Sequence, residues 1–326
     1  MNTLFVTDPL DTLLADVDAT VGLMTAAQAE GADVWVCGPE DLSVVDGRLR
    51  ARASRVVLHE RTRGDDHRWL IGSPWYAAEG PRPVDVAETM EVAMLRIDPP
   101  VDARYLHTTY LLDLAVAAGV RVVNNPAGVR ALHEKLLALA LPDLCPATVV
   151  GACQDLVEGF VRAHGAAVVK PVDGFAGGDV WLVQDGPACR ALVESATAGG
   201  RRQVIAQEYL PDVNEGNKRL FLVDGEIVSA VLRRPSSEDF RIGPPVAAAE
   251  PDDHDRRIVD ALEPLLAVHG IALAGVDVIA GRLIEVNVTC PGGMHKTDAL
   301  LGTDLSGVIV RRLLTTRTWT REELLS

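Results

Sequence analysis

The sequence predicts an α/β protein in which a parallel-sheet βαβ domain is followed by a second domain made of two parts. Strand-like and helix-like segments alternate in the first third of the chain. Further along, a glycine-rich turn joins two strands, and two paired strands near the C-terminus carry polar side chains. A chain of 326 residues with 48% hydrophobic and 24% charged residues is long enough for two or three such folded units.

The first domain is expected to span residues 1–128. It opens with a strand, a helix and a second strand at residues 3–8, 15–30 and 33–38. The Asp46-Gly47 pair predicts a hairpin, because both residues favour the positive φ angles of a tight turn. The polar segment 60–83 is expected on the surface. A strand, a helix and a last strand follow at 91–96, 102–118 and 120–126.

The cluster from Asn124 to Gly128 ends this domain, and a helix is expected directly after it at residues 132–141. The next part, residues 129–206, contains strands and one helix, at 147–150, 155–164 (the helix), 166–172 and 179–184. The last part, residues 207–326, follows a strand at 204–210. It is expected to contain a hairpin turning at Asp224-Gly225, an irregular segment, a helix at 254–268 and paired strands at 273–280 and 282–288.

Charge and composition exclude several classes of function. With 31 basic and 46 acidic residues the net charge is −15, so general binding to nucleic acid or an anionic membrane is not expected. The five cysteines are scattered, and no zinc-protease, serine-hydrolase or P-loop motif occurs. The start of the chain has no basic segment before its apolar residues, which favours a cytoplasmic protein.

Lysine is rare in this chain. Only four of the 31 basic residues are lysines, namely Lys135, Lys170, Lys218 and Lys296. A chain that uses arginine for surface charge is expected to keep lysine where a compact ammonium group is needed. Chance retention is the alternative, and the surroundings of each lysine decide between the two.

Two strands near the C-terminus predict a metal site. Glu285 and Asn287 are two residues apart, so they share one face of a strand, while Ile284, Val286 and Val288 are expected on the other. A tight turn at residues 280–282 brings Asp277 opposite Glu285. Two carboxylates and an amide form a hard oxygen site that suits Mg²⁺. A solvated sheet face is the alternative, but its apolar flanks favour burial.

The glycine-rich turn at residues 173–178 predicts a phosphate loop. It joins two strands, which argues against a dinucleotide fingerprint, because that motif needs a helix N-terminus. Glycine lets backbone N–H groups approach phosphate oxygens closely. Lys170 ends the preceding strand and adds charge at the same place.

The order of these motifs resembles the ATP-grasp ligases, and more narrowly the bacterial glutathione synthetases. The resemblance spans nearly the whole chain and rests on an ordered set: Arg96-Ile97-Asp98-Pro99-Pro100, Val123-Asn124-Asn125-Pro126, Glu134-Lys135-Leu136, Val169-Lys170-Pro171, Gln207-Glu208-Tyr209-Leu210-Pro211, Lys218-Arg219, and Asp277 with Glu285-Val286-Asn287-Val288-Thr289. It implies an α+β ATP-grasp domain after the N-terminal domain.

The resemblance also implies roles for individual residues. Lys135 and Lys170 would contact ATP phosphates, under a loop that contains Gly174, Gly177 and Gly178. The adenine would lie against Glu208, Tyr209 and Leu210, and Asn217 stands where the family has an aspartate that holds the ribose. Arg219 and Arg234 would be catalytic and stabilise the transferring phosphoryl group. Asp277, Glu285 and Asn287 would hold one or two Mg²⁺ ions, which Mn²⁺ can replace, and the substrate would contact Arg96, Pro291, Gly292 and Gly293.

The implied reaction is an ATP-dependent ligation through an acyl phosphate. Glutathione synthetases join γ-glutamylcysteine to glycine and release ADP and phosphate. Fixed cations stabilise the charges that develop, so no nucleophilic side chain is needed. The implied partners are small-molecule substrates and further copies of the same chain in a homo-oligomer.

Two segments depart from the family pattern. Residues 235–250 replace a small-residue lid with an apolar segment containing three prolines, and Cys290-Pro291-Gly292-Gly293 replaces the usual Ser-Pro-Thr. We expect the first segment to be more ordered than a glycine-rich lid and to reshape a substrate pocket. Two alternatives therefore stay open: a ligase for another carboxylate and amine, and a nucleotide-binding protein without catalysis.

Overall fold

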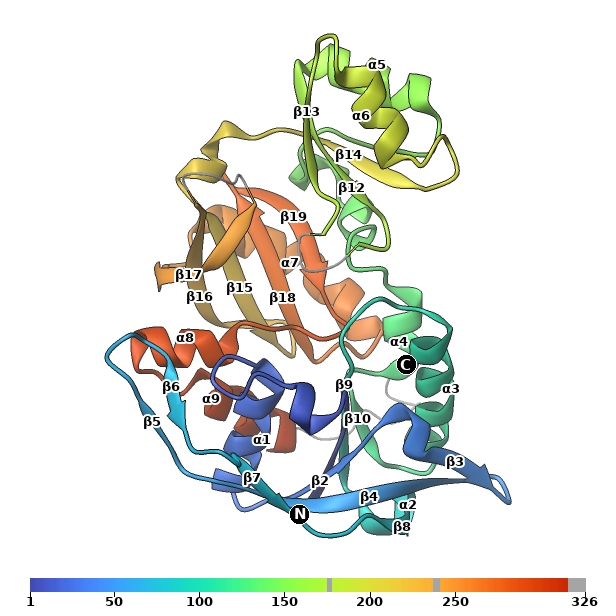
Figure 1. The fold of residues 1–326 in the computed structure, drawn as a ribbon, viewed down its shortest axis with the longest axis vertical. Helices are drawn as coiled ribbons and strands as arrows, with labels where there is room; N and C mark the ends of the chain where they lie inside the picture. Colours follow the sequence, from blue (N-terminus) through green and yellow to red (C-terminus); the bar gives the residue numbers. More distant parts are fainter. Residues whose placement is uncertain (175–177, 237–240, 316–326) are drawn as a thin grey trace.

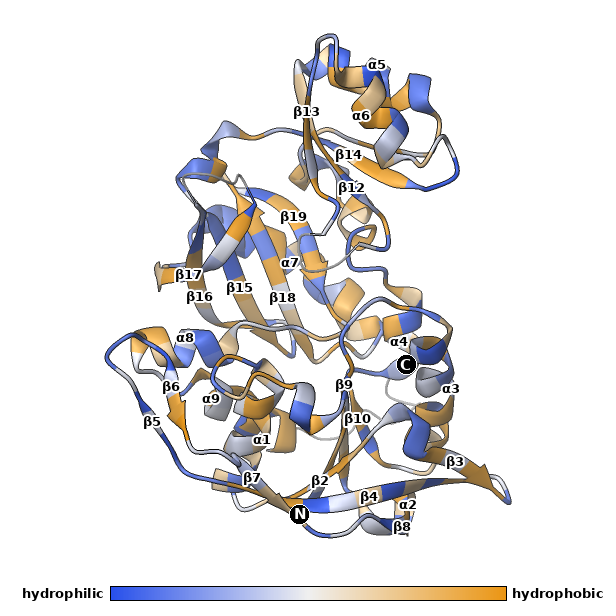
Figure 2. Cartoon of the chain, in the orientation of Figure 1, coloured by the Kyte–Doolittle hydropathy of each residue, from blue (hydrophilic) through white to orange (hydrophobic). Residues whose placement is uncertain are grey.

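The computed structural model describes residues 1–174, 178–236 and 241–315. Its elements form three parts stacked along the longest axis of the molecule (Figure 1). An N-terminal sheet lies at one end, a five-stranded sheet in the middle and a small four-stranded lobe at the other end. Bands of hydrophilic and hydrophobic residues alternate along β19 in the middle sheet (Figure 2).

The N-terminal sheet confirms the predicted βαβ opening. Strands β10, β9, β1 and β2 run parallel, and β4 adds to β2 in the antiparallel direction. Its strands are β1 (Asn2–Thr7), β2 (Asp33–Cys37), β3 (Leu42–Val45), β4 (Arg48–Leu58), β7 (Tyr76–Ala78), β8 (Arg82–Asp85), β9 (Val92–Arg96) and β10 (Arg121–Val123). The helices of this part are α1 (Ala19–Ala29), α2 (Val86–Thr89), α3 (Ala103–Ala117) and α4 (Pro126–Ala131).

The small lobe consists of a sheet in the order β11-β14-β12-β13 with two helices. Its elements are β11 (Thr148–Gly151), α5 (Gln154–His164), β12 (Ala166–Pro171), β13 (Trp181–Gln184), α6 (Cys189–Ala196) and β14 (Val204–Glu208). Strands β12 and β13 pair antiparallel, so the glycine-rich turn joins two strands as predicted. The lobe has an apolar core of its own, formed by Val157, Val169, Val193 and their neighbours.

The middle sheet has the order β17-β16-β15-β18-β19. Its elements are β15 (Asn217–Val223), β16 (Glu226–Pro235), β17 (Ile242–Ala248), α7 (Asp253–Val268), β18 (Leu273–Ile279) and β19 (Arg282–Asn287), followed by α8 (Met294–Leu301) and α9 (Leu305–Thr315). Buried residues of this sheet and of the N-terminal sheet belong to one apolar cluster, which includes Leu4, Leu95, Val276 and Val286. The two larger parts therefore share a core.

Turns and helix starts follow local chemistry. The predicted hairpins turn at Asp46-Gly47 and Asp224-Gly225, where both residues have positive φ angles. Helix α1 begins at Ala19, four residues later than predicted, because the Asp18 carboxylate caps it by accepting from Thr20 N at 2.7 Å.

The helix predicted at residues 132–141 is wrong. Pro126 instead begins α4, with Asn125 as its cap, and only residues 137–140 form a short 3-10 helix. The Glu134 carboxylate accepts hydrogen bonds from Val288 N and Thr289 N. These bonds hold the stretch against the end of β19, so it does not form a helix.

The segment at residues 60–83 is more than a surface excursion. Strands β5 (Arg61–Arg63) and β6 (Trp69–Ile71) form a hairpin, and Trp69 Nε1 donates to the carbonyl of His295 at 2.9 Å. The hairpin therefore fixes the start of α8. No helix in the described ranges has the length and apolar character that a bilayer crossing requires.

Candidate active site

A cavity of about 1390 Å³ lies where the three parts meet. Its walls come from the start of α1, the end of β9, the small lobe, the middle sheet and the first turn of α8. Small-molecule pockets commonly measure roughly 300 to 1,000 Å³. This cavity therefore has room for a nucleotide and a second small molecule together.

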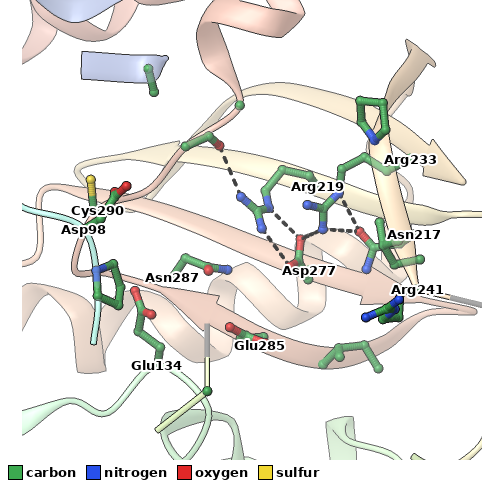
Figure 3. Close-up of a pocket in the computed structure, with 18 of the residues that line it drawn as sticks. Asp98, Glu134, Asn217, Arg219, Arg233, Arg241, Asp277, Glu285, Asn287 and Cys290 are labelled. Carbon is green, nitrogen blue, oxygen red and sulfur yellow. Dashed lines mark hydrogen bonds and ion pairs between the residues drawn. The ribbon is translucent and has the colours of Figure 1, made fainter. Parts of the chain in front are cut away.

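A network of charged groups crosses the sheet on the cavity floor (Figure 3). Arg219 on β15 lies opposite Asp277 on β18 in the strand register and binds its carboxylate with two nitrogens, at 2.5 and 2.8 Å. Arg233 on β16 donates to the same carboxylate at 2.6 Å and to the amide oxygen of Asn217 at 2.6 Å. Burial alone would raise the pKa of Asp277, but the two guanidinium groups outweigh it and lower the pKa to about 2.

Two of the four lysines face one carboxylate across the cavity. Lys170 Nζ lies 3.7 Å from one oxygen of Glu285, and Lys135 Nζ lies 4.0 Å from the other. Lys135 also donates to the carbonyl of Gly174 in the glycine-rich turn. Both ammonium groups are nearly buried, and they converge from the small lobe and from the segment that leads to it. Such a pair of fixed cations suits phosphate oxygens.

The predicted metal ligands share the cavity side of the sheet. Asp277 pairs with Glu285 and Gly275 with Asn287 in the register of β18 and β19. Asn287 Nδ2 donates to the carbonyl of Gly275 at 3.2 Å, and no donor to its amide oxygen is recorded among the described residues. Ile284 is an exception to the predicted alternation: a bulge turns it to the cavity beside Glu285.

This donor set fits a hard divalent cation, since it offers carboxylate and amide oxygens only. Within the described ranges no three His, Cys, Asp or Glu side chains cluster closely enough to form a metal site by themselves. Asp277 is fully engaged by Arg219 and Arg233. A metal at Asp277 would therefore have to displace part of that ion pair.

The hinge between the small lobe and β15 forms part of the cavity wall. Glu208, Tyr209 and Leu210 line it, and so do Val168 and Ile279 from neighbouring strands. Gly174 and Gly178 also line the cavity, whereas Gly177 lies outside the described residues. A flat, largely apolar ring such as a purine suits such a slot.

The two adjacent arginines of β16 point to opposite sides of the sheet. Arg233 lines the cavity, while Arg234 is exposed, is absent from the cavity wall and donates to the carbonyl of Glu215 at 3.2 Å. The sequence prediction chose Arg234. The structure instead places Arg233 beside Arg219, as expected from the alternation of side chains along a strand.

The predicted substrate end is built around the segment that precedes α8. Arg96 Nη2 donates to the carbonyl of Pro291 at 3.1 Å, and Arg219 Nη1 donates to the carbonyl of Gly292 at 3.2 Å. Gly293 has a φ angle of 101°, which a residue with a side chain rarely adopts, and it directly precedes α8 as its N-cap residue. The segment thus connects the charged floor to the N-terminal part.

Glu134 is a residue whose position the sequence reasoning did not explain. One carboxylate oxygen accepts from Val288 N at 2.9 Å, Thr289 N at 2.8 Å and Thr289 Oγ1 at 2.6 Å. It holds the end of β19, and with it Asn287, next to Lys135. The sequence signal was its place directly before Lys135, but its partners lie some 150 residues further along the chain.

The three parts around one cavity have the arrangement of an ATP-grasp fold, and solved structures share this fold. A D-cycloserine synthetase, DcsG, aligns with a TM-score of 0.62 at 20% identity over 96% of this chain and all of the other. The ATP-grasp ligase PsnB, solved with a precursor peptide and AMPPNP, aligns with a TM-score of 0.61 at 18% identity over 96% of each chain.

Sequence comparison identifies the family. Residues 1–130 match the model of the prokaryotic glutathione synthetase N-terminal domain, and residues 134–302 match its ATP-grasp domain. Glutathione synthetase of Parasynechococcus marenigrum is 40% identical over 96% of this chain and 99% of that protein. The enzyme of Xanthomonas campestris is 34% identical over 95% and 96%, respectively. The chain belongs to the prokaryotic glutathione synthetase family, whose members are ATP-dependent carbon–nitrogen ligases.

Proposed function

We propose that this protein joins γ-glutamylcysteine to glycine at the expense of ATP, through an acyl phosphate. The observation that carries the proposal is the convergence of Lys135 and Lys170 on Glu285, beside the Arg219–Asp277 pair, in one cavity large enough for two ligands. Family membership supports the choice of substrates.

ATP would lie between the small lobe and the middle sheet. Its adenine would contact the hinge at Glu208, Tyr209 and Leu210, and its phosphates would meet the ammonium groups of Lys135 and Lys170. Gly174 and Gly178 allow the turn to approach the phosphates, and we extend the same role to Gly177 from the sequence. Asn217 would reach the ribose with its amide group, because its oxygen already accepts from Arg233.

Magnesium, or manganese in its place, would be held by Asp277, Glu285 and Asn287, and when bound it neutralises charge on the phosphates. Arg219 and Arg233, which pair with Asp277, would donate to the reacting groups, where charge develops on the transferring phosphoryl group and then on a tetrahedral oxyanion. Their fixed positions need no reorganisation during reaction. We therefore move the catalytic role predicted for Arg234 to Arg233.

The adjacent arginines provide a matched pair of variants. Arg233→Gln removes a donor from the cavity and should lower kcat by about 10²-fold or more, as removal of one preorganised donor commonly does. Arg234→Gln changes the same chemistry on the exposed face and should leave kcat within about twofold. A larger loss in the Arg234 variant would return the role to that residue.

Turnover tests the proposed substrates. Purified protein with ATP, Mg²⁺, γ-glutamylcysteine and glycine should release phosphate with kcat/KM of order 10⁴ M⁻¹s⁻¹ or more for the dipeptide. Mass spectrometry should show one glutathione formed per phosphate. If phosphate is released only with another acid and amine, the proposed substrates are wrong. If the protein binds ATP tightly but releases no phosphate with any pair, the proposed reaction is wrong.

We further propose three domains, residues 1–128, 129–206 and 207–326, in a homo-oligomer that acts in the cytoplasm. The two family models meet between residues 130 and 134, which supports the first boundary. None of the five cysteines forms a disulfide, as is usual in a reducing compartment. The small-molecule substrates would enter the shared cavity.

A further inference from the structure

Arg96 is a buried cation without a counter-ion in the described part of the chain. Arg96 is 3% exposed, and it lines the cavity at the end of β9. Its recorded partners are neutral: the hydroxyl of Thr20 at 3.2 Å and the carbonyl of Pro291 at 3.1 Å. Burial of a guanidinium group without an anion is costly, so this position favours an anionic ligand.

Lys296 is a second cation in the wall of the same cavity. It lies in the first turn of α8, is half-buried and lines the cavity. Each of the other three lysines faces a carboxylate of the protein: Glu285 for Lys135 and Lys170, and Asp252 with Asp255 for Lys218. For Lys296 no hydrogen bond or ion pair occurs with residues 1–174, 178–236 or 241–315.

The position of Lys296 is fixed by the packing of its helix. His295 Nε2 donates to the carbonyl of Ala15 at 3.1 Å, and the His295 ring stacks on Trp69 at 5.3 Å between centroids. Thr297 N donates to the carbonyl of Gly293 at 2.9 Å. Its neighbours on both sides are thus anchored, and the lysine side chain between them faces the cavity.

The aspartates that the N-terminal part adds to this wall already have partners within the protein. Asp18 accepts from Thr20 N at 2.7 Å, and Asp8 accepts from Asp98 N at 3.0 Å and pairs with Arg104 at 3.5 Å. Burial raises the pKa of the neighbouring Cys290 thiol most, and Asp98 also helps to raise it. Figure 3 shows Asp98 and Cys290 side by side. These carboxylates therefore do not neutralise Arg96 or Lys296 through an ion pair.

Arg96 and Arg219 contact neighbouring carbonyls of the segment that precedes α8. Arg219 bonds the Gly292 carbonyl from the side of the phosphate site, and Arg96 bonds the Pro291 carbonyl from the side of the N-terminal part. Within the described ranges neither Arg96 nor Lys296 shares a hydrogen bond or ion pair with Arg219, Arg233 or Asp277, the groups assigned to the reacting centre.

We propose that Lys296, with Arg96, binds a substrate carboxylate that does not react. This inference rests on the proposed function and adds a specificity determinant to it. Two groups have this chemistry in the proposed reaction: the α-carboxylate of the glutamyl residue in the donor, and the carboxylate of glycine in the acceptor.

Kinetics with paired substrates test the proposal. Each carboxylate is replaced in turn by a carboxamide, in the γ-glutamylcysteine α-amide and in glycinamide. Lys296→Met should raise the KM of one charged substrate about 10- to 100-fold, the usual scale of a charge-assisted hydrogen bond. It should leave the KM of the matching amide and of ATP within about twofold. The arm that responds identifies which substrate the lysine contacts.

Two further variants control for folding and charge. Lys296→Arg keeps the cation and should stay within several-fold of the unmodified protein, and Arg201→Met removes an exposed cation outside the cavity and should change nothing. Equal losses for the charged and amide substrates in both arms, or no loss in either, would overturn the proposal.

Failure of the proposed function gives a different result. The unmodified protein would then turn over neither γ-glutamylcysteine nor its amide. In that case the test uses the acid and amine that do release phosphate, with their non-reacting carboxylates converted to amides. If Lys296→Met does not distinguish those analogues either, the subsite is wrong independently of the substrates.

Discussion

Removal of the Glu134 carboxylate should loosen the end of β19 and weaken the binding of both ATP and Mg²⁺. Glu134→Ala deletes three hydrogen bonds to one oxygen, two of them from backbone N–H groups of the buried residues Val288 and Thr289. A bond to a charged group contributes about 1.5 to 3 kcal/mol, and bonds that share an acceptor are not additive. We therefore expect the free energy of unfolding to fall by about 3 kcal/mol.

The functional effect should follow from the neighbours of Glu134. Asn287 directly precedes Val288, and Lys135 directly follows Glu134, so both lose their fixed positions. The KM of ATP and the Mg²⁺ concentration for half-maximal turnover should each rise by about tenfold or more, since a misplacement of about 1 Å can cost 10²-fold in rate.

Glu134→Gln is the matched control for this experiment. Its amide oxygen can still accept from Val288 and Thr289, so it should keep most of the stability that the alanine variant loses. Urea unfolding and ATP titrations measure both variants. An alanine variant with unchanged stability and unchanged KM would refute the structural role of Glu134.

Three further predictions concern the phosphates, the metal and a buried histidine. Lys170→Met and Lys135→Met should each weaken binding of a non-hydrolysable ATP analogue by about tenfold in calorimetry; unchanged affinity in both would remove the phosphate assignment. Glu285→Gln should raise the Mg²⁺ concentration needed for turnover more than Asn287→Ala does. If the Glu285 variant has the same Mg²⁺ dependence as the unmodified protein, the metal site is wrong. Burial and the nearby Arg61 lower the pKa of His295 from 6.5 to about 3. The unfolded chain therefore takes up a proton below pH 6.5 that the folded chain does not, and stability falls as the pH drops toward 3. Between pH 7 and pH 5 the unmodified protein should lose about 2 kcal/mol more than His295→Gln in urea unfolding; parallel pH profiles would contradict a neutral His295.

Local patterns predicted the parts of the fold that depend on local chemistry. Aspartate–glycine pairs marked two hairpin turns correctly, because the backbone angles required there are set by the turn itself. The pairing of Asp277 with Glu285 followed from one short turn. Helix α7 starts one residue from its predicted start because Asp252 caps it in a local capping box.

Contacts between residues far apart in the sequence determine the elements that local patterns did not predict. Glu134 prevents the predicted helix because its carboxylate binds residues 154 and 155 positions further on. Strand β17 lies in a segment that was expected to be irregular. It contains two prolines, but it lies at a sheet edge, where a missing N–H is tolerated. Part of the altered lid segment, residues 237–240, lies outside the described residues.

The choice between Arg233 and Arg234 shows the same limit within the site. Adjacent arginines are indistinguishable by type, and only the register of β16 against β15 says which one faces the cavity. Asn217 pairs with Arg233 in that register, so the facing residue is fixed by a partner 16 positions away.

The central claim is that ATP phosphorylates the substrate carboxylate within this cavity. The most direct test uses γ-glutamylcysteine whose reacting carboxylate carries ¹⁸O, with unlabelled ATP, Mg²⁺ and glycine. An acyl phosphate transfers one labelled oxygen to phosphate for each amide bond formed, and mass spectrometry of the released phosphate should show that label. Amide formation with unlabelled phosphate would contradict the account.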